Sequence, residues 1–582
     1  MKNERNRIFT TLSIICFILL LRNLYLLIFI QPVGYVVDIY SMFPLSFYLA
    51  LIVCYFVAAF LVLNGEKILG VLILCLNHFE ILIIPYMLRY YSMGRADDMY
   101  YIGEYLKITT SGHISNSDIY PASHIIGSSL SMICSLEAHY VSFIIPIIFS
   151  FLFIAGIYLF SRELFPDSCI SFLVLVSSFI LYLGTYNFLN VPHALFFSFT
   201  PLYLWIISKY AKRYHYTSFS IIFVVMTLLI TFTHPFVIFF LFLYFLFHII
   251  SRFLTGLNMG ILQIQKIKIS SFSVLIISYM GWFINNDTLM TYFRVYYKNF
   301  INKITDPVYF ETTEKLAKIN FDFFDYLRLF SFYYGRFVFP TFIIILSGIY
   351  LYFNKNLLKE KSLENYPYLL FLYGMFLFAQ IVLLFNPLIS HQPDRILNLN
   401  FVVYSQIPLF SCSLYLLFLK KSKSFNKLLP VCAILTIIWS FSLFGCFDSP
   451  NVYRPNVALT TNEIDGMVWF YKVKDESTLV VPGVSQINRF HYIFGNSEKM
   501  DTVEDIPDHF GYVNNSGNFI DTNSGLGEES YIIIFTLDEL LYQKVPSYKA
   551  VGRYTPGDFH RFRTDNSVNE IYDSENIEIF RT

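Results

Sequence analysis

Two adjacent aspartates, Asp97 and Asp98, carry the strongest chemical signal in the sequence, in a run that directly follows a long apolar segment. One carboxylate at the edge of a dry cavity can act as a general base and take a proton from an attacking hydroxyl. Its neighbour can orient it, raise its pKa by like-charge repulsion, or hold a divalent cation such as Mg²⁺ or Mn²⁺. We take Asp97 and Asp98 as the candidate catalytic pair and expect no other cofactor. A solvated acidic loop paired with Arg95 is the alternative.

Several side chains near the ends of apolar runs suit sugar or phosphate binding. The candidate substrate-binding residues are Arg95, Tyr101, His113, Tyr120, His124, His234, His391 and Arg395. A guanidinium fork matches phosphate oxygens, so Arg395, just before an apolar run, is the candidate phosphate ligand. Each also has a plainer interpretation: Arg395 as an anchor at the membrane surface, and His234 as a hydrogen-bonding group at a helix end.

The composition predicts a polytopic α-helical membrane protein. Of 582 residues, 56% are hydrophobic and 14% are charged, whereas soluble proteins average about 25% charged residues. Repeated apolar runs of about 20 residues separate short polar loops, which is typical of membrane-spanning helices. We expect about thirteen of them, over residues 8–30, 43–63, 68–88, 138–160, 169–187, 196–210, 218–233, 236–251, 270–286, 336–353, 367–386, 398–419 and 428–447. Residues 218–251 can also be read as one long span.

The distribution of Lys and Arg predicts the orientation in the membrane. The N-terminus is basic and alternate loops carry the basic clusters, while loops 31–42, 186–195 and 387–397 carry few or none. Basic loops stay in the cytoplasm. A cytoplasmic N-terminus and an odd number of crossings place both the aspartate pair and the C-terminal part outside a cell membrane.

A change in charge marks a domain boundary near Asp448. From there to the end the chain has 11 Lys and Arg against 21 Asp and Glu, so the preceding part has an excess of ten basic residues. We expect a transmembrane domain over 1–447, with outer loops 89–137 and 287–335, and an extracytoplasmic α/β domain over 448–582. A capped helix after Thr460, buried strands at 477–484 and 531–537 and a hairpin at 569–580 define the latter. No basic stripe predicts nucleic-acid binding.

Two further segments and two short sequence motifs have open interpretations. Residues 122–136 read as a short helix that packs at the outer surface or re-enters the membrane. The loop 287–335 reads as an amphipathic helix in the interface or as a lid over a site, which are compatible. Possible glycosylation sequons begin at Asn286 and Asn514.

The outer aspartate run resembles the first outer loop of GT-C superfamily glycosyltransferases, such as protein O-mannosyltransferases and aminoarabinose transferases. Asp97, Asp98, Tyr101, Gly112 and Pro121 match that pattern in order. The helical plan, with its outer catalytic loop and outer C-terminal domain, also looks similar. Two departures are that the pair follows the third expected helix, not the first, and that the WWDYG-type motif of oligosaccharyltransferases is absent.

The resemblance implies a polyprenyl- or dolichyl-phosphate-linked sugar donor and an inverting transfer to a hydroxyl of a glycan, protein or lipid acceptor. It implies that Asp97 is the general base, Asp98 its partner and Arg395 the ligand of the donor phosphate. A polysaccharide polymerase or ligase would be expected to use Arg-rich outer loops instead. A transporter would carry more mid-span charges than Arg22 and Glu80 and show internal repeats. A non-catalytic envelope scaffold remains the fourth alternative.

Overall fold

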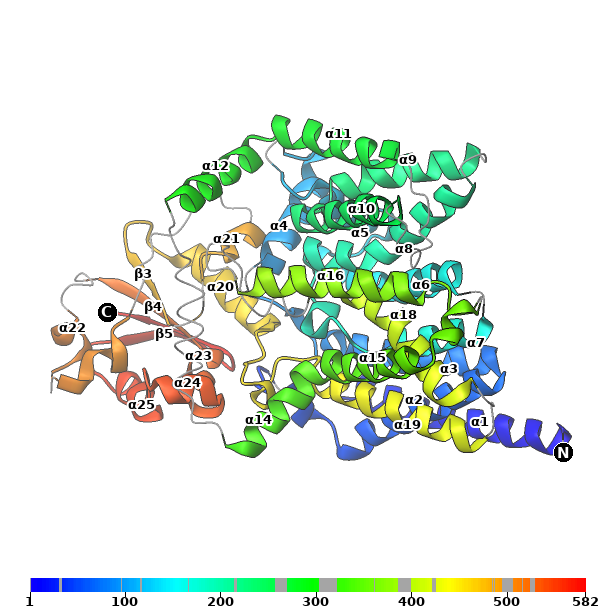
Figure 1. The fold of residues 1–582 in the computed structure, drawn as a ribbon. Helices are drawn as coiled ribbons and strands as arrows, with labels where there is room; N and C mark the ends of the chain where they lie inside the picture. Colours follow the sequence, from blue (N-terminus) through cyan, green and yellow to red (C-terminus); the bar gives the residue numbers. More distant parts are fainter. Residues whose placement is uncertain are drawn as a thin grey trace.

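A bundle of long helices and a small α/β module at one end of it form the protein, as the computed structural model shows (Figure 1). The N-terminus lies at the opposite end of the bundle from the module (Figure 1), an arrangement that an odd number of crossings requires. The structure describes residues 2–30, 34–95, 97–115, 118–165, 167–213, 217–256, 269–302, 322–360, 362–385, 399–420, 425–483, 485, 487–494, 506–514, 517–523 and 529–582.

Each of the thirteen expected ranges overlaps a helix. They are α1 (Lys2–Ile28), α2 (Leu45–Asn64), α3 (Lys67–Met87), α6 (Ala138–Leu164), α7 (Ser168–Ser178), α8 (Pro192–Arg213), α9 (Thr217–Thr231), α10 (Pro235–Gly256), α11 (Ile269–Asn285), α15 (Gly335–Phe353), α16 (Tyr366–Leu384), α18 (Val403–Leu414), which η5 (Tyr415–Leu419) continues, and α19 (Phe425–Phe444).

Seven helices of the described chain are long and apolar enough to cross a membrane. They are Arg7–Ile28, Leu45–Asn64, Lys67–Met87, Ala138–Leu164, Phe323–Phe353, Tyr366–Leu384 and Phe425–Phe444. Five further apolar helices are shorter. The protein is therefore a membrane protein, while the number of crossings and the side on which each terminus lies stay predictions.

The expected helix over 169–187 is wrong in its second half, because α7 ends at Ser178. Beyond it the backbone amide of Leu181 donates to the Ser442 hydroxyl of α19 at 3.2 Å. Gly184 then adopts a left-handed conformation and begins the short turn η2 (Gly184–Asn187). This bond replaces a helical one, so the apolar run after Ser178 stays buried without being α-helical.

Prolines fix two helix starts that matter for the site. Pro235 begins α10 after α9 ends at Thr231, which leaves His234 in the break between the two helices. The expected short helix over 122–136 is present as α5 (Pro121–Cys134), and Tyr120 immediately precedes it. His234 and Tyr120 therefore each lie directly before the first residue of a helix, where the backbone fixes the position of their side chains.

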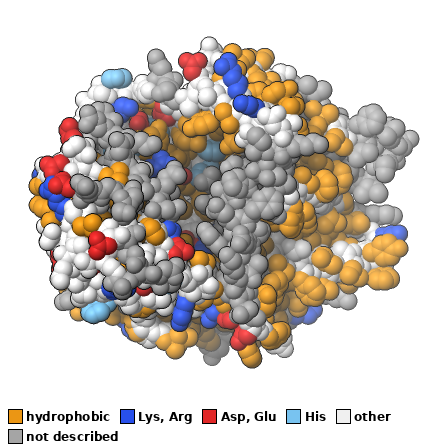
Figure 2. Space-filling view, turned by 90° about the vertical axis from the view of Figure 1, so that its left-hand side faces the viewer, with side chains coloured by type: hydrophobic (Ala, Val, Ile, Leu, Met, Phe, Trp, Pro, Cys, Tyr) orange, Lys and Arg blue, Asp and Glu red, His pale blue; other side chains and the backbone are white. Residues whose placement is uncertain are grey.

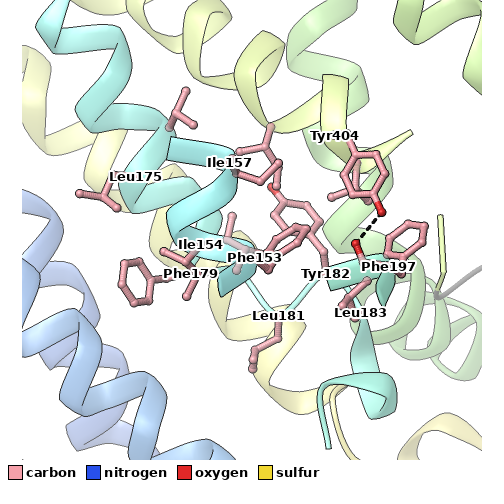
Figure 3. Close-up of a cluster of buried hydrophobic side chains, with 14 of the residues drawn as sticks. Phe153, Ile154, Ile157, Leu175, Phe179, Leu181, Tyr182, Leu183, Phe197 and Tyr404 are labelled. Atoms are coloured by element: carbon pink, nitrogen blue, oxygen red, sulfur yellow. Dashed lines mark hydrogen bonds between the residues drawn. The ribbon is translucent and has the colours of Figure 1, made fainter. Parts of the chain in front are cut away.

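Tightly packed side chains hold the bundle together behind the site. Phe153 of α6, Phe179 after α7 and Phe197 of α8 belong to one buried cluster (Figure 3). The Tyr404 hydroxyl of α18 donates to the Phe197 carbonyl oxygen at 2.6 Å, drawn as a dashed line in Figure 3. Packing and hydrogen bonds of this kind hold membrane helices together where hydrophobic burial between them gives little.

We use the name outer module for the described residues from β2 (Leu459–Thr460) to the C-terminus, because they lie at one end of the helical bundle (Figure 1). Its four-stranded sheet has the order β3-β4-β6-β5, with β3 (Leu479–Pro482) parallel to β4 (Ser530–Phe535) and with β6 (Ile577–Arg581) antiparallel to both β4 and β5 (Asn569–Ser574). The helices around it are α20 (Thr461–Val473), α21 (Phe490–Phe494), α22 (Phe519–Thr522), α23 (Thr536–Lys544), α24 (Pro546–Val551) and α25 (Pro556–Arg563). The helix, strands and hairpin expected from the sequence are thus present.

The outer module is joined to the segment that precedes the aspartate pair. Strand β1 (Tyr90–Ser92) pairs antiparallel with β2. The Arg95 guanidinium donates to a Glu463 carboxylate oxygen at 2.5 Å and to the Ala458 carbonyl oxygen at 3.1 Å, and both charged side chains are buried. Thr460 and Glu463 also form the capping box of α20, so one carboxylate serves both the cap and Arg95.

Helix α21 of the outer module packs directly on α4 (Asp97–Ser111), the helix that carries the aspartate pair. The two helices approach closely at Gly103, where an added Cβ would overlap with the Tyr492 carbonyl oxygen. We expect Gly103→Ala to lower the free energy of unfolding by about 1–3 kcal/mol, because backbone cannot give way as a flexible side chain can.

Thermal unfolding of the purified protein measures this effect. Gly374→Ala in α16 is the matched control, because nothing lies within 4 Å of an added Cβ there. That change should be neutral or stabilise by up to about 1 kcal/mol. Equal melting temperatures for both variants would show that α21 does not hold α4 at this distance.

Candidate functional site

Asp97 and Asp98 form the first turn of α4, where a helix N-terminus favours carboxylates. Asp97 is half-buried and Asp98 is buried. The Ser92 hydroxyl donates to an Asp98 carboxylate oxygen at 3.2 Å. The two side chains therefore differ in access: Asp97 is partly exposed, while Asp98 is buried and held by Ser92.

Burial raises the pKa of Asp98 to about 7, and the like charge of Asp97 adds to this rise. Hydrogen bonds from Ser92 and the Gly94 amide oppose it. A carboxyl group whose pKa is higher in the folded than in the unfolded chain binds its proton more tightly when folded. The proton on Asp98 therefore stabilises the folded chain fully below about pH 4, the usual pKa of an aspartate in the unfolded chain. This stabilisation is lost as the pH rises towards about 7.

We expect Asp98→Asn to remove this pH dependence, because the amide imitates the protonated carboxyl. Above pH 7 the variant should be more stable than wild type by up to about 4 kcal/mol, at about 1.4 kcal/mol per pKa unit. The difference should vanish near pH 4. Melting temperatures of both proteins from pH 4 to 8 measure it.

The comparison isolates Asp98 because Asp448, whose pKa burial also raises to about 7, is present in both proteins. A variant less stable than wild type at every pH would show that the ionised carboxylate itself is required. A constant difference across the range would likewise contradict the expected titration.

Aromatic and histidine rings from five segments form a continuous cluster beside the aspartate pair. The rings of Tyr100 and Tyr101 lie 5.7 and 5.4 Å from that of His124. Tyr120 stacks on His234 at 5.0 Å with the planes 4° apart, and His193 lies 5.3 Å from His234. We call these residues, with Tyr105 and Tyr186, the ring cluster; Tyr105 lies 6.3 Å from His124 and Tyr186 lies 5.5 Å from His193.

Tyr101 links the ring cluster to the aspartate pair. Its pKa is raised chiefly by burial, then by Tyr120 and by Asp97, which places both within electrostatic reach of its hydroxyl. The Tyr105 hydroxyl donates to the Asn190 side-chain oxygen at 3.1 Å, which fixes a second ring of α4. The pair and the rings therefore form one candidate site.

An aspartate that the sequence analysis did not select orients His124. The Nδ1 atom of His124 lies 2.6 Å from a carboxylate oxygen of Asp118, and both side chains are buried. The Tyr120 amide donates to the other carboxylate oxygen at 2.8 Å, and the Asn286 side chain donates to the Asp118 carbonyl oxygen at 3.0 Å. Within the described chain the Nε2 atom of His124 is buried and has no hydrogen-bond partner.

Six of the ten predicted site residues come together here: Asp97, Asp98, Tyr101, Tyr120, His124 and His234. Arg95 instead points to Glu463. Within the described residues, the hydrogen bonds of exposed His113 go to Ser111. His391 and Arg395 lie outside the described residues.

The sequence analysis missed Asp118, His193, Tyr105 and Asn190. Asp118 lies six residues before His124, close enough to be found had the pair been considered. The others carry no local signal, because nothing in the neighbouring sequence distinguishes them from other buried polar residues.

The side chain of Asn286, the first residue of a predicted sequon, is buried. It accepts a hydrogen bond as the N-cap of α12 (Asp287–Ile301) and donates one to the Asp118 carbonyl oxygen, so a glycan there would have to displace both hydrogen bonds.

A groove with a volume of about 370 Å³ opens beside Asp118. It lies between α5, α9 and α11. Its lining residues are Ser115, Asp118, Pro121, Ala122, Ile125, Leu229, Phe232, Trp282, Asn285 and Asn286. Figure 2 shows the end of the molecule that carries the outer module, with histidine side chains in a hollow above the middle of this face.

The predicted divalent cation would have to bind through Asp97 and Asp98. Among the described residues, no three His, Cys, Asp or Glu side chains come together in a way that could hold a metal ion. An oxygen site on this pair would therefore need substrate oxygens or water to complete it, as Mg²⁺ sites with one or two carboxylates do.

Sequence comparisons match this chain to no family model and to no curated protein. Among solved structures it is similar to the crystal structure of ArnT from Cupriavidus metallidurans in the apo state. The TM-score is 0.46 at 9% identity, over 88% of this chain and 97% of that one. This level of likeness assigns no role to any residue of this chain.

Proposed function

We propose that this protein is a membrane glycosyltransferase that moves a sugar from a polyprenyl- or dolichyl-phosphate-linked donor to a hydroxyl acceptor, with inversion. One observation carries the proposal: an accessible aspartate, Asp97, lies beside a buried aspartate, Asp98, and against a cluster of tyrosine and histidine rings at one end of an apolar helical bundle. The order of Asp97, Asp98, Tyr101, Gly112 and Pro121, which resembles the GT-C first outer loop, supports it.

In this mechanism Asp97 takes the proton of the acceptor hydroxyl as that oxygen forms a bond to the anomeric carbon. The bond from the anomeric carbon to the donor phosphate oxygen breaks, and the electron pair leaves with the lipid phosphate. Asp98, with its raised pKa, carries less negative charge near neutral pH, which leaves Asp97 as the proton acceptor. Tyrosine rings of the cluster offer faces on which a sugar can pack. Arg395 is proposed as the ligand of the donor phosphate.

The proposal places the site and the outer module on the extracytoplasmic side of a cell membrane, with the N-terminus in the cytoplasm. The basic loops counted in the sequence support this orientation. The termini at opposite ends of the bundle agree with it (Figure 1).

Purified protein in lipid vesicles, supplied with a radiolabelled polyprenyl-phosphate sugar and a membrane extract as acceptor source, tests the proposal. We expect labelled product and free polyprenyl phosphate in equal amounts. Parallel reactions with EDTA and with added Mg²⁺ or Mn²⁺ determine whether the aspartate pair needs a cation. Absence of donor cleavage under all these conditions would refute the proposed reaction.

A further inference from the structure

One face of α15 carries large apolar side chains that are exposed in the part of the chain that the structure describes. They recur every three or four residues, so they form one continuous stripe along the helix. The members of this α15 stripe are Phe342, Ile345, Leu346, Ile349, Tyr352 and Phe353. The opposite face, with Ile344, Ser347 and Leu351, is buried in the bundle. In a membrane, the α15 stripe is therefore a surface along which a lipid chain can lie.

The α15 stripe ends in a shallow hollow with a volume of about 490 Å³. The residues that line this hollow are Tyr352, Phe353, Asn354, Lys355, Asn356 and Leu357. Tyr352 and Phe353 are 68% and 78% exposed. Aromatic side chains at the end of a membrane-spanning helix are typical of the head-group level of a bilayer. The hollow therefore lies where the head group of a lipid on the α15 stripe would be.

The hollow lies at the end of the bundle opposite the outer module. The chain enters α15 from α14 (Phe323–Leu329), whose Arg328 guanidinium donates to the hydroxyl of Tyr453, in the segment that leads to the outer module, at 3.2 Å. From there α15 runs towards the far end of the bundle (Figure 1). The loop that follows contains Lys355, Lys359 and Lys361 and is one of the basic loops predicted to stay in the cytoplasm. The cytoplasmic leaflet is the one that is rich in anionic lipids.

The charge of the hollow suits a phosphate. Lys355 is the one charged residue among the described residues that line it, and its ammonium nitrogen lies 5.0 Å from the centre of the Tyr352 ring, whose face attracts a cation. The nearest acidic residue in the sequence, Glu360, has its carboxylate 2.8 Å from the Lys420 ammonium instead. The exposed Asn356 side chain adds amide N–H donors. The lining therefore offers a positive charge and hydrogen-bond donors to an anionic oxygen.

We propose that this hollow binds the head group of an anionic glycerophospholipid, with the phosphate beside Lys355 and one acyl chain along the α15 stripe. Tyr352 is then a positioning residue, since it holds the ammonium group of Lys355 over its ring. A zwitterionic phospholipid offers the same phosphate, but its own amine repels Lys355, so the hollow prefers the anionic lipid. The site lies at the other end of the bundle from Asp97 and is independent of the proposed sugar transfer.

Fluorescence quenching of a tryptophan placed in the hollow measures this preference. Tyr352→Trp keeps an aromatic ring beside Lys355, and the unsubstituted chain supplies the signal of its own four tryptophans. The full chain in phosphatidylcholine nanodiscs receives a small fraction of brominated phosphatidylglycerol or of brominated phosphatidylcholine. We expect the anionic lipid to quench the added tryptophan with about fivefold higher relative affinity, because one Lys near an anionic lipid surface contributes about 1 kcal/mol.

Two lysine variants locate the preference. Lys355→Gln, made in the Tyr352→Trp protein, keeps most of the side-chain length without the charge and should bring the affinity ratio to about one. Lys298→Gln is the matched control and should leave the ratio unchanged, because Lys298 is also exposed but belongs to α12, at the end of the bundle that carries the outer module (Figure 1). Equal quenching by both lipids, or a preference that Lys355→Gln leaves intact, would overturn the inference.

Native mass spectrometry tests the same site without the added tryptophan. The unsubstituted chain, released from membranes that contain phosphatidylglycerol and phosphatidylcholine, should retain phosphatidylglycerol, and Lys355→Gln should retain several-fold less of it. Because Lys355 is exposed, both proteins should have the same melting temperature. Equal retention of phosphatidylglycerol by the two proteins would also overturn the inference.

Discussion

Asp97→Asn is expected to reduce sugar transfer by about 10²–10⁴-fold, the usual contribution of a general base. The amide keeps the size of the side chain and its place in the first turn of α4 but cannot take a proton. Because Asp97 is half-buried and not part of the core, the melting temperature should change little. The initial rate of labelled product formation measures the effect, with donor binding followed separately.

Asp287→Asn is the control for this prediction, because Asp287 is an exposed carboxylate in the first turn of another helix, α12. It should keep wild-type activity. Full transfer activity in Asp97→Asn would assign the base to another group. The transfer rates of Asp97→Asn and wild type are compared only if the two proteins have equal melting temperatures. If Asp97→Asn does not fold, Asp97→Ser, which has a smaller side chain, replaces it in the same comparison.

Glu463→Gln is expected to lower the free energy of unfolding by about 3–5 kcal/mol, because it leaves the buried Arg95 guanidinium without its counter-charge. Glutamine at this position can still complete the capping box of α20, so the change removes the charge and keeps the cap. Arg95 directly precedes α4, and its second bond goes to the Ala458 carbonyl oxygen. The same variant should therefore reduce transfer activity by loosening the start of the helix that carries Asp97.

Two comparisons make this effect specific. The double variant Arg95→Met with Glu463→Gln removes both charges and should regain part of the lost stability, since apolar replacements of a buried ion pair are often neutral. Glu539→Gln disrupts an exposed pair with Arg563, which keeps Glu578 as a partner, and should cost less than about 1 kcal/mol. Equal losses for Glu463→Gln and Glu539→Gln in chemical or thermal unfolding would contradict a structural role for the buried pair.

Local signals in the sequence were sufficient for most elements. Pro121 and Pro235 mark helix starts, and Thr460 with Glu463 marks the cap of α20, because proline geometry and side-chain caps act within one turn. The residues after Ser178 were misassigned since an apolar run reads the same whether it is helical or a buried turn. Only the contact between Leu181 and Ser442 of a distant helix distinguishes the two.

The site was predictable to the extent that its residues lie in one outer loop. Asp97, Asp98, Tyr101, Tyr120 and His124 are within 28 positions of one another, so chain proximity alone makes their meeting probable. The role of Arg95 was not predictable, because its partner Glu463 lies 368 residues away in the sequence. The contributions of His193, Asn190 and Asn286 also depend on how distant helix ends pack.

The sequence by itself determined that this chain is an apolar helical protein with a polar α/β C-terminal part and an aspartate pair at the end of an apolar run. Composition, periodicity and capping act over a few residues and can be read without knowing the partners. Only the tertiary structure decided which aspartate is buried, that Asp118 orients His124, and that the outer module holds the start of α4. Burial and hydrogen bonding depend on which distant segments meet, and that information is not local to any stretch of the chain.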